Sequence, residues 1–131
     1  MINKKICIVY SHHKLGDLIW QLPYIKSISD YHSCKITLVT RPKTQAKDIL
    51  KDEVYIEKIH YNLFRKKICF ILDLVSLLFF FKKEKFTHIY LLDKISRPAI
   101  AARLAGVKNI IGVGIGNQSK WITNKKYLSN E

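Results

Sequence analysis

The sequence predicts an α/β protein with a Rossmann-like, doubly wound parallel sheet of about five strands. Short apolar or alternating runs of strand length recur along the chain, and a helical stretch separates most of them. Strands that alternate with helices imply right-handed crossovers and a sheet covered by helices on both faces. With 131 residues, 48% of them hydrophobic, the chain is long enough to bury a core. We therefore expect residues 1–131 to form one domain.

The first half of the chain supplies three of the predicted strands. Two apolar runs predict strands at 5–10 and 35–39, and alternation with period two predicts a third at 54–59. A helix is expected over about 17–31, where Pro23 should kink it or mark its true start. Pro42 should open a short helix that runs to about Leu50.

The second half continues the same alternation. A long helix is predicted over roughly 65–83, followed by a strand at 88–92. Pro98 suits the first turn of a helix that runs to Leu104, with Gly106 as its C-cap. A fifth strand is expected at 109–113, and the tail beyond it is polar and basic.

A candidate catalytic carboxylate follows the first strand, in the segment Leu15-Gly16-Asp17. Open parallel sheets bind ligands outside the carboxyl ends of their strands, so Asp17 is expected where chemistry takes place. Gly16 would let a ligand approach the backbone without meeting a Cβ. The simpler interpretation of Asp17 is a helix N-cap that accepts first-turn N–H groups. Trp20 stands where a capping box needs Glu or Gln, and both interpretations stay open.

The charge balance favours an anionic partner. The chain has 23 basic and 10 acidic residues, a formal net charge of +13. Such an excess is typical of proteins that meet phosphorylated ligands, anionic membranes or nucleic acid. No nucleic-acid motif is present, so we expect no nucleic-acid partner. His12-His13 beside Lys14 suits a phosphate contact or a solvated loop, and no metal or cofactor is expected because no second ligand cluster accompanies them.

The glycines after the fifth predicted strand and the cysteines both favour structural roles. Gly114-Ile115-Gly116 follows the fifth predicted strand, but too little chain follows it to build a dinucleotide-binding βαβ unit. Cys7 and Cys69 lie inside apolar runs, which predicts buried free thiols in a reducing compartment. The N-terminus has no signal-peptide pattern, so we expect a cytoplasmic protein.

Residues 68–81 form an apolar run with basic residues on both sides. As a helix the run is roughly 21 Å long, short of the ~30 Å needed to span a bilayer, and Asp73 interrupts it. One interpretation is a buried core helix. The other is a helix that also enters a membrane interface while its flanking lysines meet lipid phosphates. In that case Glu at Leu77 and Phe80 should release the chain from anionic vesicles.

Three segments in this order resemble glycosyltransferase family 9, the ADP-heptose:lipopolysaccharide heptosyltransferases. They are Leu15-Gly16-Asp17 with Leu22-Pro23 at matching spacing, the strand segment 86–93, and the segment 97–113 that runs through Gly106. The resemblance covers essentially the whole chain but only the N-terminal half of such enzymes. It implies the N-terminal half of a GT-B architecture, in which two Rossmann-like halves enclose the active site.

The resemblance implies that Asp17 is a general base. It would take a proton from an acceptor hydroxyl as that oxygen attacks the anomeric carbon of a nucleotide sugar, with inversion and without metal. The acceptor would be a phosphorylated glycolipid of the lipopolysaccharide core. Candidate acceptor-binding residues are Lys14, Gly16, Arg65, Lys66, Lys125 and Lys126.

The resemblance also implies what the chain does not supply. The C-terminal half that binds the nucleotide-sugar donor is absent, so we expect the polypeptide to be inactive alone. The expected location is the inner face of the bacterial inner membrane, with the anionic membrane surface as a further partner. The alternative function is a non-catalytic remnant or a membrane-surface-binding α/β module.

Overall fold

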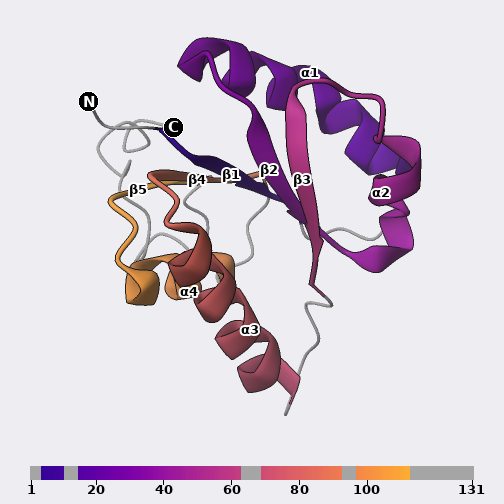
Figure 1. Cartoon of the computed structure of the whole chain (residues 1–131). Helices are drawn as coiled ribbons and strands as arrows, with labels where there is room; N and C mark the ends of the chain where they lie inside the picture. The colour runs from indigo at the N-terminus through magenta and orange to yellow at the C-terminus, as the bar shows by residue number, and fades with distance from the viewer. Residues whose placement is uncertain (1–3, 11–14, 63–68, 93–96, 113–131) are drawn as a thin grey trace, which may run out of the picture.

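The computed structural model describes residues 4–10, 15–62, 69–92 and 97–112, which form an α/β fold (Figure 1). All strand pairs are parallel, and the sheet has the order β3-β2-β1-β4-β5. The prediction of a five-stranded parallel sheet is confirmed. The strands are β1 (Ile6–Val9), β2 (Ile36–Thr40), β3 (Ile56–Tyr61), β4 (His88–Leu91) and β5 (Asn109–Ile111).

Helices cover both faces of the sheet, as a doubly wound fold requires. The helix α1 (Leu15–His32) and the short α2 (Ala46–Ile49) lie on one face, and a 3-10 turn at Pro42–Thr44 precedes α2. The helices α3 (Cys69–Glu84) and α4 (Arg97–Ala105) lie on the other face, as Figure 1 shows.

The two faces of the sheet bury separate apolar cores. In β1 the side chains alternate, so that Ile6 and Ile8 pack in the core on the α1 side while Cys7 and Val9 pack against α3 and α4. Every residue of β1 and β2 is buried, because these strands are covered on both faces. Cys7 is a buried free thiol, as predicted, and burial raises its pKa well above the usual value.

The third strand begins and ends two residues later than expected. The strand continues past Ile59 to Tyr61, and its burial does not alternate: residues 57 and 58 are both exposed, whereas 56 and 59–61 are partly buried. In the structure Ile56 N–H donates to the Glu53 carbonyl, which keeps residues 53–55 in a turn before the strand. The pairing of β2 with β3 also shifts register between Ile36 and Thr37.

The helix ends agree with the expected capping and proline positions. Gly106 has φ +83°, and its N–H donates to the Arg103 carbonyl while Val107 N–H donates to the Ala102 carbonyl. This is the Schellman arrangement, and it confirms Gly106 as the C-cap glycine of α4. Pro23 lies inside α1, so it does not mark the start of that helix.

The helix α3 confirms the predicted long helix over its described length and shows which side is buried. Leu77 and Phe80 face the core, with 0% and 8% of their surface exposed. The expectation that Glu at these two positions would test membrane contact is therefore wrong, because either change would disrupt the core. Within the described ranges, no helix combines the length and apolar character required to cross a membrane.

Candidate functional site

The topology places a switch point between the carboxyl ends of β1 and β4. From β1 the chain crosses by α1 to β2 on one side, and later returns by α3 to β4 on the other side of β1. Helix α1 then starts on one face of the sheet and α4 on the opposite face (Figure 1). Ligands of open α/β sheets bind at such a point.

Asp17 lies at this switch point, as the third residue of α1. Because the helix begins at Leu15, Asp17 is inside its first turn. Both interpretations of its carboxylate, as a cap of first-turn N–H groups and as a catalytic acid, remain predictions. The positive end of the helix dipole favours the ionised form of an acid in this turn. The orientation of the Asp17 side chain lies outside what the structure describes.

Gly16 occupies an open position in the same turn. A Cβ built on it would meet no other atom within 4 Å, and its φ is not in the left-handed region. Neither the backbone conformation nor the packing therefore requires glycine here. The space above Gly16 is left free next to Asp17.

The basic residues of the candidate acceptor site lie outside the described part of the chain. These residues are Lys14, Arg65, Lys66, Lys125 and Lys126, and the same holds for His12 and His13. Their roles remain predictions. Among the residues that are described, no three His, Cys, Asp or Glu side chains gather to hold a metal ion.

The structure adds a buried charged group that the sequence analysis did not select. Asp73 of α3 and Arg97 of α4 form an ion pair, with 3.8 Å between Oδ2 and Nη1. Both side chains are almost fully buried, and the Asn62 amide donates to the backbone carbonyl of Asp73 at 3.4 Å. Asn62 follows β3 directly and Arg97 opens α4, so the group lies at the carboxyl edge of the sheet.

Arg41 brings a second guanidinium to the same edge, directly after β2. Burial lowers the pKa of Arg97, while the Asp73 charge raises it and the Arg41 charge lowers it further. One signal could have found Arg41 and Asn62: each is the first residue after the end of a parallel strand.

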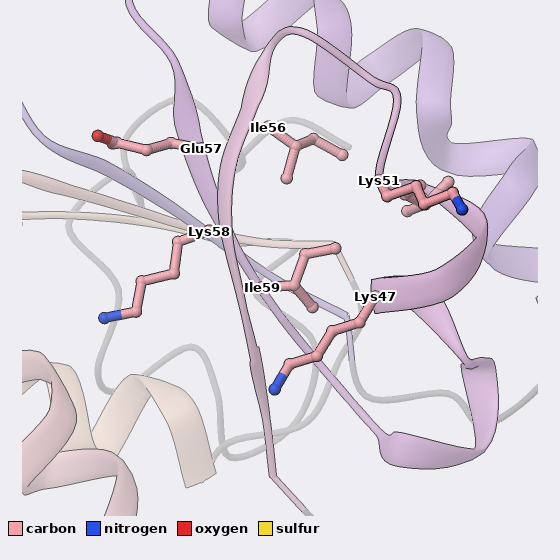
Figure 2. Close-up of a pocket in the computed structure, with 7 residues that line it drawn as sticks. Lys47, Lys51, Ile56, Glu57, Lys58 and Ile59 are labelled. Atoms are coloured by element: carbon pink, nitrogen blue, oxygen red, sulfur yellow. The ribbon is translucent and has the colours of Figure 1, made fainter.

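Two hollows among the described residues lie away from the switch point. Figure 2 shows one of about 250 Å³ between α2 and the edge strand β3, in which Ile56 and Ile59 point toward α2. Another, of about 450 Å³, lies at the amino edge of the sheet. Its lining residues are Lys4, Phe86, Thr87, His88, Gly106, Lys108 and Asn109.

The strand order and the crossovers define a Rossmann-like α/β fold, with Asp17 at the carboxyl edge of its sheet. No model of a known protein family matches the sequence, and no curated protein matches it. Solved glycosyltransferase structures do share the fold. A glycosyl transferase of family 9 from Veillonella parvula superposes with a TM-score of 0.67 and 18% identity, over 83% of this chain and 32% of that one.

Two further structures show the same relationship. The ADP-heptose LPS heptosyltransferase II of E. coli gives a TM-score of 0.65 at 13% identity, over 82% of this chain and 30% of the other. The MurG structure of Acinetobacter baumannii gives 0.68 at 15% identity, over 92% and 40%. The chain thus has the α/β fold found in GT-B glycosyltransferases, as predicted, and it spans 30% to 40% of their length.

Proposed function

We propose that the chain is the acceptor-side domain of a glycosyltransferase that acts on the lipopolysaccharide core. The observation that carries this proposal is the place of Asp17, in the first turn of the helix at the switch point of a glycosyltransferase-like sheet. The likeness to a structure described as an ADP-heptose LPS heptosyltransferase supports the choice of donor and acceptor class.

In the proposed reaction Asp17 is the general base. Its carboxylate accepts the proton of an acceptor hydroxyl while the oxygen attacks the anomeric carbon of the nucleotide sugar. The bond from that carbon to the donor's diphosphate oxygen breaks, its electron pair leaves with the nucleotide, and the anomeric configuration inverts. A helix N-terminus keeps the acid ionised, which makes the base available but weak. Positioning of the acceptor must then supply much of the rate.

The proposed acceptor is a phosphorylated glycolipid, held by five basic residues of the chain. Arginine forks bind phosphate with two hydrogen bonds, and lysines act as point charges. The open space over Gly16 would let the acceptor approach the first turn of α1. The proposed contacts are Lys14, Arg65, Lys66, Lys125 and Lys126.

The proposal also requires a donor-binding domain beyond this chain. A nucleotide sugar would be bound by that second domain, so the chain alone should have no measurable affinity for ADP-sugars. The complete enzyme would work in the cytoplasm, at the inner face of the bacterial inner membrane. Tight nucleotide binding by the isolated chain would contradict this division of roles.

Substitution of Asp17 tests the proposal. In the enzyme completed with its donor domain, Asp17→Asn should lower kcat by orders of magnitude and leave the unfolding midpoint unchanged. Asp30→Asn is the matched control, because Asp30 is an exposed acid near the other end of α1. Near-normal turnover in Asp17→Asn would contradict a role as general base.

The second candidate function is a non-catalytic remnant or a membrane-surface-binding module. The exposed apolar residues on α3, such as Phe79, favour the membrane part of this alternative. A reading frame for a donor domain directly downstream of codon 131 would favour the enzyme. Lack of such a frame, together with vesicle binding by the chain, would favour the module.

A further inference from the structure

The helix α3 places its side chains in an unusual way for a helix at a water-exposed surface. Its acid Asp73 is 4% exposed, whereas Ile71, Leu72 and Phe79 are 63%, 61% and 67% exposed. A surface helix normally turns its apolar stripe to the core and its charges to water. The outward side of α3 is therefore suited to a surface less polar than water.

The exposed apolar residues share one side of the helix. Ile71, Leu72, Val75 and Phe79 follow the spacing i, i+1, i+4 and i+8, and we call them the outer face of α3. The opposite side, with Leu77 at its centre, packs into the core beneath. In Figure 1 the first turns of α3 extend past α4 at the lower end of the molecule.

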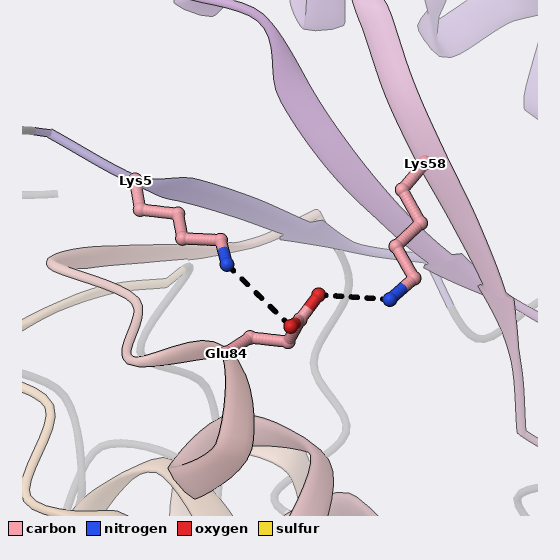
Figure 3. A network of polar contacts seen from close by, with 3 residues as sticks. All are labelled: Lys5, Lys58 and Glu84. Carbon is pink, nitrogen blue, oxygen red and sulfur yellow. Dashed lines mark hydrogen bonds and ion pairs between the residues drawn. The ribbon is translucent and has the colours of Figure 1, made fainter.

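Two lysines continue the outer face at the end of the helix. Lys82 and Lys83 are exposed and lie one turn beyond Phe79. No acid opposes them on the outside of the described helix. Asp73 is buried, and Glu84 is turned to Lys5 and Lys58, whose Nζ atoms lie 3.5 and 2.9 Å from its carboxylate oxygens (Figure 3).

We propose that the outer face of α3 docks on an anionic lipid bilayer surface. The apolar side chains enter the boundary between headgroups and acyl chains, and Lys82 and Lys83 meet lipid phosphates. The formal net charge of +13 favours an anionic surface over a second copy of this chain, because a copy would bring two strongly basic molecules together. This inference deepens the proposed function by naming the surface that meets the membrane, and it requires no role for Asp17.

Vesicle sedimentation tests the apolar part. The chain should bind vesicles of phosphatidylcholine with phosphatidylglycerol, and Leu72→Glu with Phe79→Glu should lower the partition coefficient by tenfold or more. Tyr31→Glu with Val54→Glu is the matched control, since Tyr31 and Val54 are each 80% exposed and lie outside α3. This control should partition like the unchanged chain. Circular dichroism and the unfolding midpoint verify that both variants are folded.

A second pair of variants tests the electrostatic part. Lys82→Gln with Lys83→Gln should weaken binding to the anionic vesicles about thirtyfold, at roughly 1 kcal/mol for each lysine near the surface and ~1.4 kcal/mol per factor of ten. Lys26→Gln with Lys35→Gln removes the same charge from exposed positions elsewhere and should have little effect. Equal partition of the unchanged chain onto neutral and anionic vesicles would overturn the proposal.

Two other results would also overturn it. Unchanged vesicle binding by the Leu72→Glu, Phe79→Glu variant would show that another surface docks. A dimer that forms without vesicles and is lost in the same variant would show that the face binds a second copy. Asp17→Asn should bind vesicles normally, so failure of the docking proposal and failure of the catalytic proposal can be told apart.

Discussion

Asp73 and Arg97 join α3 to α4 through an ion pair buried beneath the carboxyl edge of the sheet. Asp73 is also fixed from the side of β3, because the Asn62 amide donates to its backbone carbonyl. Burial of two charges is costly, and the ion pair offsets part of their desolvation. The pair thus holds the start of α4, beside the switch point, in a fixed relation to α3.

Removal of the carboxylate should therefore be strongly destabilising. Asp73→Ala removes a counter-charge from the buried Arg97 guanidinium, so we expect the free energy of unfolding to fall by about 3–5 kcal/mol. Urea denaturation followed by circular dichroism measures the change. A loss below about 1 kcal/mol would mean that water or another group takes over the role of Asp73.

The ion pairs of Glu84 provide the control for that experiment. Glu84 contacts Lys5 and Lys58, which are 39% and 49% exposed, so solvent screens both pairs. Glu84→Gln should cost about 0.2–1 kcal/mol per pair. The loss should shrink as salt is added, because the screening length shortens as ionic strength rises and exposed pairs such as these are screened much more than buried ones. The effect of Asp73→Ala should depend far less on salt.

Stability should fall when the pH drops below the ordinary pKa of histidine. Burial lowers the pKa of His32, with the His88 and Lys4 charges adding to the effect, and burial likewise lowers the pKa of His88. The two rings lie 4.7 Å apart, and His32 Nε2 shares a 2.7 Å hydrogen bond with the Tyr90 hydroxyl. As the pH falls from about 6.5, the unfolded chain therefore binds protons before the folded chain does. The free energy of unfolding falls over this range, until the pH is below the folded pKa values of both histidines.

Denaturation curves at pH 7.5, 6.0 and 5.0 measure this effect. Replacement of His88 by Gln removes one titrating ring and should flatten the decline between pH 7.5 and 5.0. Ser27→Ala is the control, because Ser27 is exposed and has no titrating side chain, so the slope should stay as in the unchanged chain. An unchanged slope in His88→Gln would contradict the assignment.

The fold could be predicted because local patterns coincide with the global architecture. Apolar runs gave the central strands, and Gly106 marked the end of α4. The ends of β3 could not be read, because residues 54 and 55, which have the composition of a strand, lie in the turn before it. The side of α3 that packs inward could not be read either. Apolar residues surround that helix, and only tertiary packing distinguishes Leu77 from Phe79.

The place of Asp17 in the chain could be predicted, because it follows the first strand after a short loop, and the structure has it in the first turn of α1. Its catalytic role stays a prediction. The pairing of Asp73 with Arg97 could not be predicted, since two crossovers bring together residues from separate helices. In sequence, Asp73 was notable only as an interruption of an apolar run.

Gly16→Ala tests whether glycine at this position serves folding stability or acceptor binding. A methyl group at Gly16 meets no atom within 4 Å, and the residue is helical, so the free energy of unfolding should stay unchanged or rise by up to ~1 kcal/mol. In the complete enzyme the same methyl group would obstruct an acceptor that approaches the backbone, so KM for the acceptor should rise about tenfold, at ~1.4 kcal/mol per factor of ten. Gly106→Ala is the control: its Cβ is equally unobstructed, but φ is +83°, so stability should fall by roughly 1–2 kcal/mol with KM unchanged. If Gly16→Ala leaves KM unaltered, the acceptor does not approach α1 at this turn.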